Sequence, residues 1–252
     1  MMGPPMTSAP ENSDDPTLPA PVHRGPRGEL EPIAEAQPGE LASARYRWSI
    51  GLALAAIQSG VYFGIGHAHL TRSTELLRTR LDDAIPFWPW TAWCYLPFYA
   101  GTFLIAVGGF RRRVLFNRAA TAVILVMLIG AMGHLFIGAE YPRPVLVPPY
   151  PNLSYAFMAW VQHVDPPGNV FPSLHVAHTT LLASLLIRDR PRLGRVALVM
   201  ATMLAVSTLT TKQHFLADVV SGYLLAFLGR AYALSSISLF PSAWRRRRGQ
   251  PS

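Results

Sequence analysis

Two short segments of the sequence combine histidine with residues that bind or transfer phosphoryl groups. In the first, Pro172, Ser173 and His175 open an apolar stretch, directly after a turn-forming Asp-Pro-Pro-Gly run at 165–168. Proline suits the first turn of a helix, and the unpaired N–H groups at a helix start bind anions, with the Ser173 hydroxyl as an added donor. This segment therefore predicts a phosphate site at the beginning of a helix.

The second segment reads Lys-Gln-His-Phe-Leu-Ala-Asp at 212–218. If a helix has begun by His214, Asp218 lies four residues further on the same face. Its carboxylate could then orient the imidazole and stabilise its cation. A histidine held in this way is suited to act as a nucleophile.

The spacing of the two segments predicts that they meet. His175 and His214 are 39 residues apart, enough for one membrane span inward, a short turn and one span outward. Both histidines should therefore reach the same membrane surface, together with Arg143 from the loop at 140–171. We expect one pocket that contains two histidines, the Asp218 carboxylate, a serine and two cations, Arg143 and Lys212.

The rest of the chain is composed like a membrane protein. Charged residues are 14% of its 252 residues, whereas an ordinary soluble domain has about a quarter. Stretches without Asp, Glu, Lys or Arg that can cross a core about 30 Å thick cover 48–71, 84–110, 119–139 and 166–187, with shorter ones at 196–211 and 219–229. The sequence predicts an all-α integral membrane protein with about six transmembrane helices.

Clusters of arginine predict how these helices are oriented. They lie between apolar stretches or after the last one, at 111–118, 188–195 and 245–248, and the positive-inside rule makes these segments cytoplasmic. Both termini are then cytoplasmic and the histidine pocket faces outward, most simply across a plasma (inner) membrane. Although the net charge is +8, the clusters fit topology and anionic head groups better than nucleic acid.

The predicted domain organisation has three parts. Residues 1–44 are rich in Pro, Glu, Ala and Gly and are expected to form a disordered cytoplasmic tail. Residues 45–240 should form the six-span catalytic domain, and 241–252 a basic cytoplasmic tail. The lone Cys94 excludes an intramolecular disulfide. His178, one turn beyond His175, we interpret as a packed helix residue, and the oligomeric state stays open.

These segments resemble the type 2 phosphatidic acid phosphatase superfamily, whose motifs are K-x6-R-P, P-S-G-H and S-R-x5-H-x3-D. The counterparts in this sequence are Arg143-Pro144, the run Pro-Ser-Leu-His at 172–175, and Ser207 with His214 and Asp218. The resemblance extends over about 82–228. It is closest to the branch of inositol phosphorylceramide synthases, on the segments at 83–89, 165–167 and 211–214.

The resemblance implies a mechanism and a class of substrate. His214 would attack phosphorus to form a phosphohistidine, Asp218 would orient it, and His175 would protonate the leaving oxygen. Arg143, Ser173 and Lys212 would bind the phosphoryl oxygens, without a metal or another cofactor. The substrate would be a phospholipid, sphingolipid or isoprenoid lipid.

The sequence also departs from the family motifs. Phe136 stands where the first motif has lysine, Thr208 where the third has arginine, and Leu174 where the second has glycine. With two phosphate-binding cations missing, we expect a phosphodiester substrate and the transfer of an inositol phosphate-like head group between lipids. The alternatives are a phosphatase for lipid phosphates or isoprenoid diphosphates and, as a minor one, a non-catalytic transporter or scaffold.

Overall fold

A computed structural model describes residues 41–68 and 73–235. The predicted basic tail at 241–252 and all but the end of the predicted N-terminal tail lie outside the described residues. Within the described part the chain is helical, with two isolated bridges and no strand longer than these. The α-helices are α1 (Ala44–Gly66), α2 (Arg80–Ala84), α3 (Tyr95–Leu104), α4 (Arg113–Phe136), α5 (Leu153–Val164), α6 (Leu174–Leu186), α7 (Pro191–Thr210) and α8 (Leu216–Leu234).

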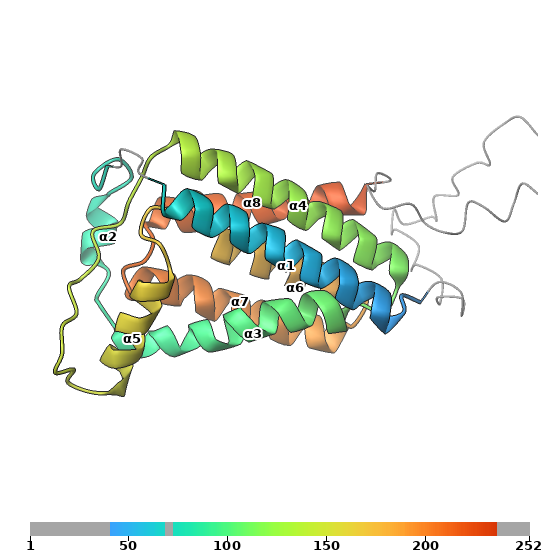
Figure 1. The fold of residues 1–252 in the computed structure, drawn as a ribbon, viewed down its shortest axis with the longest axis horizontal. Helices are drawn as coiled ribbons and strands as arrows, with labels where there is room; N and C mark the ends of the chain where they lie inside the picture. The colour runs from blue at the N-terminus through green and yellow to red at the C-terminus, as the bar shows by residue number, and fades with distance from the viewer. Residues whose placement is uncertain (1–40, 69–72, 236–252) are drawn as a thin grey trace, which may run out of the picture. The chain divides into compact units, whose positions relative to one another are not determined.

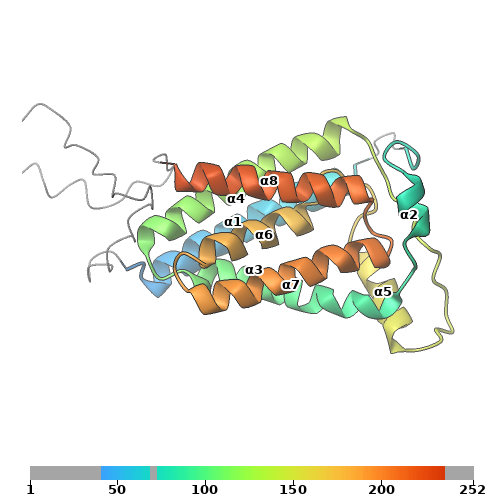
Figure 2. The same ribbon diagram turned by 180° about the vertical axis from the view of Figure 1, so that it is seen from behind.

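The long helices run side by side, with α6 at the centre (Figures 1 and 2). Helix α6 packs against α3, α4, α7 and α8, and ten of its 13 residues are buried. Its apolar side chains, among them Leu181, Leu185 and Leu186, join the main core with residues of α4 and α8. The centre of the bundle therefore holds the helix that begins with the first histidine segment.

Among the described residues, three helices, α1, α4 and α7, are long and apolar enough to cross a membrane, whereas α6 is apolar but shorter. The charge-free stretch at 166–187 contains α6, which begins at Leu174, inside the segment at 171–175 that was expected to open the span. Ser173 is its N-cap and accepts a hydrogen bond from the Val176 N–H at 3.5 Å. Pro172 thus precedes the cap instead of occupying the first helical turn as predicted.

The expected span at 84–110 is not one regular helix. It consists of a 3₁₀ segment at Pro89–Cys94, then α3, then a π-helical turn at Ile105–Gly109. Pro89 opens the first segment, where the missing N–H does no harm, and two adjacent glycines, at 108 and 109, end the last. Gly109 also allows close packing, because a Cβ there would lie 3.3 Å from Leu186.

Two shorter helices, α2 and α5, lie at one end of the bundle, beside the ends of the long helices (Figure 1). Helix α5 falls inside the long segment at 140–171 that the sequence did not predict as helical. Asn152 caps it by accepting hydrogen bonds from the N–H groups of Ser154 and Tyr155. Helix α2 begins with a capping box between Thr79 and Asp82.

Two of the arginine-rich connections meet at the other end of the bundle. Arg112 forms an ion pair with the buried Asp189 at 3.2 Å and donates to the Arg188 carbonyl at 2.7 Å. The start of α1 is close by, since the Ala42 N–H donates to the Arg111 carbonyl at 3.0 Å. Two of the three arginine clusters that the charge pattern assigned to one membrane side therefore lie at one end of the bundle, and the third, at 245–248, lies outside the described residues.

Candidate active site

His214 lies on the turn between α7 and α8, held by contacts on both sides. Its Nδ1 is 3.3 Å from Asp218 Oδ2, which also accepts the Phe215 N–H at 2.8 Å. The condition that was set for this contact, a helix that has begun by His214, is not met, because α8 begins at Leu216. The contact with Asp218 still forms, since Asp218 caps the start of α8 and faces back toward the preceding turn.

The backbone of α7 fixes this turn. The Thr208 carbonyl accepts the N–H groups of Gln213 at 2.9 Å and of His214 at 3.2 Å. Ser207 donates through its hydroxyl to the Thr91 carbonyl at 2.7 Å, and its own carbonyl accepts the Thr211 hydroxyl at 2.6 Å. Ser207 and Thr208, which stand where the family motif has serine and arginine, thus hold the histidine turn in place.

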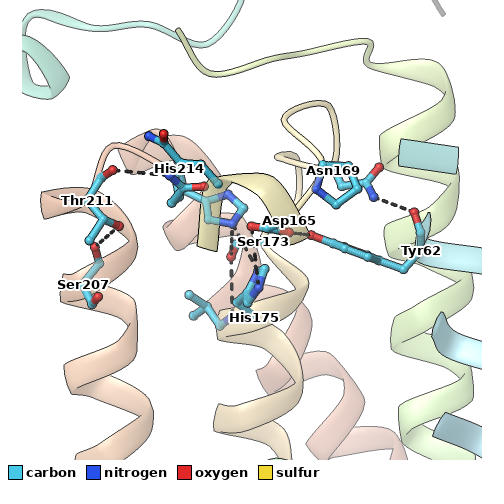
Figure 3. Close-up of polar contacts among 12 residues, drawn as sticks. Tyr62, Asp165, Asn169, Ser173, His175, Ser207, Thr211 and His214 are labelled. Atoms are coloured by element: carbon cyan, nitrogen blue, oxygen red, sulfur yellow. Dashed lines mark hydrogen bonds and ion pairs between the residues drawn. The ribbon is translucent and has the colours of Figure 1, made fainter. Parts of the chain in front are cut away.

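The other nitrogen of His214 faces the start of α6 (Figure 3). His214 Nε2 is 3.4 Å from His175 Nδ1 and 3.2 Å from Ser173 Oγ. The Ser173 N–H donates to the Asp218 carbonyl at 3.1 Å, so the starts of α6 and α8 are joined directly. All four side chains are at most 5% exposed. The structure therefore brings two histidines, a serine and a carboxylate into one buried cluster.

Asp165 and Tyr62 complete this cluster, and the sequence analysis did not select them as site residues. Asp165 Oδ2 is 4.0 Å from His175 Nε2, and the Tyr62 hydroxyl donates to Asp165 Oδ1 (Figure 3). Asn169 donates to the Tyr62 carbonyl at 2.6 Å. The Asp-Pro-Pro run could have indicated Asp165 as a site residue. Nothing near Tyr62 in the sequence indicates its contact with Asp165, which lies 103 residues away.

Arg143 reaches the site edge but is turned toward backbone carbonyls. It donates to the carbonyls of Asp165 at 2.5 Å and of Gln162 and Pro166 at 3.4 Å, and one nitrogen lies 3.5 Å from Asp165 Oδ2. These contacts cap the C-terminal end of α5. Arg143 therefore holds the loop that carries Asp165, and the charge it brings near the histidines is partly matched by that carboxylate.

Lys212 also has a protein partner. Its Nζ donates to the Asp82 carbonyl at 2.7 Å, and its backbone adopts the left-handed conformation with φ of 57°. A non-glycine residue in that region is uncommon and is found at strained functional turns. Partial burial lowers the pKa of Lys212, and the neighbouring Asp82 and Asp83 act in the opposite direction.

Two further positions bear on the departures from the family motifs. Leu174, in place of glycine, is buried against α4, where a Cβ on Gly130 would lie 2.4 Å from it. Phe136, in place of lysine, is 74% exposed at the end of α4. Leu174 thus points into the bundle core and Phe136 to its outside. Within the described residues, no three His, Cys, Asp or Glu side chains gather as metal ligands.

Comparison with known proteins assigns the chain to a family. The chain belongs to the PAP2 superfamily, which it matches over residues 68–232. The superfamily comprises membrane-embedded phosphatases and phosphotransferases that act on lipid phosphates. The family match and the apolar helices α1, α4 and α7 together indicate a membrane protein.

A relative in the archaeon Methanocaldococcus jannaschii, an uncharacterised protein, is 27% identical over 127 residues. The match covers 48% of this chain and 52% of that protein, so the chain spans about half the length of its relative. No solved structure matches the chain.

Proposed function

We propose that the protein transfers a phosphorylated, inositol phosphate-like head group from one lipid to the hydroxyl of another through a phosphohistidine on His214. The observation that carries the proposal is the arrangement around this ring. Its Nδ1 faces the Asp218 carboxylate, and its Nε2 faces His175 and Ser173. A carboxylate that accepts a hydrogen bond from Nδ1–H keeps the proton on Nδ1. Nε2 then has a free electron pair, as a nucleophile requires.

The reaction then proceeds in two balanced steps. His214 Nε2 attacks phosphorus and forms the N–P bond, while the bond from phosphorus to the lipid oxygen breaks and that oxygen takes a proton from His175. In the second step the acceptor hydroxyl gives its proton to His175 and its oxygen attacks phosphorus. The N–P bond breaks and His214 returns to its initial state. Asp165, 4.0 Å from His175 Nε2, stabilises the protonated form of His175 before the first step and after the second.

The charge of the site supports a phosphodiester donor. The motif positions at Phe136 and Thr208 carry no charge, and Arg143 and Lys212 each donate to backbone carbonyls. Of the predicted phosphate-binding residues, all in the described part of the chain, the Ser173 hydroxyl and the remaining N–H groups of Arg143 and Lys212 are the side-chain donors left for phosphoryl oxygens. A diester carries one negative charge less than a monoester at neutral pH and needs fewer cations, which favours transfer of a head group over hydrolysis of a phosphomonoester.

We also propose that the bundle crosses the membrane six times, through α1, α3 with its flanking turns, α4, α6, α7 and α8. The histidine cluster would open to the extracytoplasmic side. The ion pair between Arg112 and Asp189 supports this orientation, because it gathers the arginine-rich connections at the end opposite α2 and α5. A cysteine introduced next to Lys212 should react with a membrane-impermeant reagent from outside intact cells. Labelling from the cytoplasmic side alone would contradict the orientation.

The test of the reaction uses purified protein in vesicles that contain phosphatidylinositol labelled in its head group and ceramide. Phosphatidic acid is tested in parallel, with EDTA present throughout. Labelled inositol phosphate on ceramide is the expected product, whereas release of free phosphate from phosphatidic acid alone would assign the site to hydrolysis. His214→Ala should abolish turnover. The matched control is His67→Ala, which alters an exposed histidine at the end of α1.

A further inference from the structure

A cavity of about 270 Å³ extends from the histidine cluster into the bundle between α1, α3, α4 and α6. Tyr62, Asp165 and His175 line it at the site end, and Gly51 lines it further along α1. Tyr62 follows Gly51 by 11 positions, which corresponds to about 16 Å along a helix. Most of the wall is apolar, including Leu54, Phe103 and other side chains of the four helices. A lipid that presents its phosphate to His214 has room here for the part of the molecule next to the phosphate.

One polar pair interrupts the apolar wall at a defined depth. Gln58 of α1 and His178 of α6 both line the cavity, and their side chains are 3.1 Å apart at Gln58 Nε2 and His178 Nδ1. His178 follows His175 by three residues, so it lies about 4.5 Å deeper along the helix axis. Gln58 precedes Tyr62 by four residues and is displaced from it in the same direction.

From its sequence position His178 is expected to be a packed helix residue, and the contact with Gln58 agrees with part of that expectation. Within the described part of the chain, the pair nevertheless has more hydrogen-bond donors and acceptors than it uses. A glutamine amide has two N–H donors and an acceptor oxygen with two lone pairs, and the structure gives Gln58 a hydrogen bond to His178 only. Polar groups in an apolar wall are unfavourable unless they are hydrogen-bonded. The unused groups of Gln58, which is half-buried, therefore favour a ligand that brings a hydrogen-bonding group to this depth.

We infer that Gln58 and His178 select lipids that carry a hydroxyl, ester or amide group one or two carbon atoms beyond the phosphate ester oxygen. This inference rests on the proposed function, because it assigns the substrate class of the same site. Glycerol-based and sphingoid lipids carry such groups. An isoprenoid or simple alkyl phosphate has hydrocarbon at that depth and would leave the polar pair facing it.

The test compares two lipids of equal chain length and equal head-group charge, oleoyl lysophosphatidic acid and oleyl phosphate. Their competition for purified His214→Ala protein in one detergent is measured by mass spectrometry of the bound lipid. We expect the lipid with the hydroxyl and ester to bind about tenfold more tightly, the effect of one hydrogen bond. Adding Gln58→Leu and His178→Leu should bring the ratio to within about twofold. Equal binding before these changes, or an unchanged ratio after them, overturns the inference.

Two further variants separate the role of the Gln58–His178 pair from general effects of substitution on folding and packing. Thr179→Val changes the neighbouring residue on α6, which lines a second cavity between α3, α6 and α7, and should keep the preference. If the double leucine variant does not fold, Gln58→Leu alone should reduce the preference at least threefold. Turnover by the protein with His214 intact is measured separately with phosphatidylinositol as the donor and ceramide as the acceptor. If the lipid preference is found without turnover, the proposed transfer is refuted and the inference on selectivity holds. If turnover is found without the preference, the inference on selectivity is refuted and the proposed transfer holds.

Discussion

Asp82 is the residue that ties the segment before the second apolar stretch to the histidine turn. Its side chain is 2% exposed. Oδ1 accepts the Leu216 N–H at the start of α8 at 2.7 Å, and Oδ2 accepts the N–H and hydroxyl of Thr79 at 2.8 and 2.6 Å. Its carbonyl accepts Lys212 Nζ at 2.7 Å. We expect Asp82→Ala to loosen the turn that carries His214.

The size of the effect follows from the hydrogen bonds that are lost. An unpaired, partly buried Leu216 N–H costs up to about 3 kcal/mol, and loss of the capping interaction with Thr79 costs about 1 kcal/mol. The free energy of unfolding should therefore fall by about 3 kcal/mol, which for a chain of this size lowers the melting temperature by about 6–12 °C. Since a small displacement of a catalytic group slows reaction steeply, kcat should fall at least tenfold, with a smaller change in KM.

The neighbouring carboxylate offers a matched control. Asp83 pairs with Arg78 at 2.8 Å, but their side chains are 55% and 41% exposed, and such surface pairs contribute about 0–1 kcal/mol. Thermal unfolding in detergent and turnover in vesicles are measured for both alanine variants. If Asp82→Ala lowers the melting temperature and kcat no more than Asp83→Ala does, the reasoning that Asp82 positions the turn is refuted.

Three further substitutions test other contacts of the site. Tyr62→Phe removes the hydroxyl that donates to the carboxylate beside the second histidine. We expect kcat to fall about tenfold at an unchanged melting temperature, and unchanged kcat would exclude a role in turnover. Because burial lowers the pKa of Lys212 from its ordinary 10.5, its ammonium loses its proton at lower pH than an exposed lysine. Activity should then decline on the alkaline side, and Lys212→Arg should move the decline to higher pH; identical profiles would contradict this. Gly222→Ala places a Cβ 2.7 Å from the Ser173 carbonyl and should lower both melting temperature and turnover. Gly60→Ala, with nothing within 4 Å, should lower neither, and equal effects of the two would show that the close approach of α8 and α6 is unimportant.

The helices were predictable from the sequence for a physical reason. A segment in contact with lipid must satisfy its backbone hydrogen bonds internally, so a long apolar stretch has little alternative to a helix. Each of the six predicted stretches accordingly contains a helix or a chain of helical turns. The irregularity at 84–110 was not predicted, because 3₁₀ and π turns depend on how Pro89 and Gly109 pack against neighbouring elements. Helix α5 was also missed, since charge and length alone do not reveal a helix in a connection.

Part of the site could be predicted as well. His214 and Asp218 are close in sequence, and capping of a helix start brings them together locally. The spacing of His175 and His214 indicated a common end of the bundle because it fits two antiparallel helices. The two cations, Arg143 and Lys212, were identified by charge, but their contacts were not: each donates to backbone carbonyls of another segment.

What the sequence by itself determined is therefore local: apolar runs that must be helical, and histidine segments with neighbours suited to phosphoryl chemistry. Only the tertiary structure decided that Tyr62 and Asp165 lie beside His175, that Asp82 holds the start of α8, and that Gln58 faces His178 across a cavity. These contacts join residues 10 to 134 positions apart. They depend on how the helices pack, which no single segment encodes, because the partner of each polar group is chosen by the packing of the whole bundle.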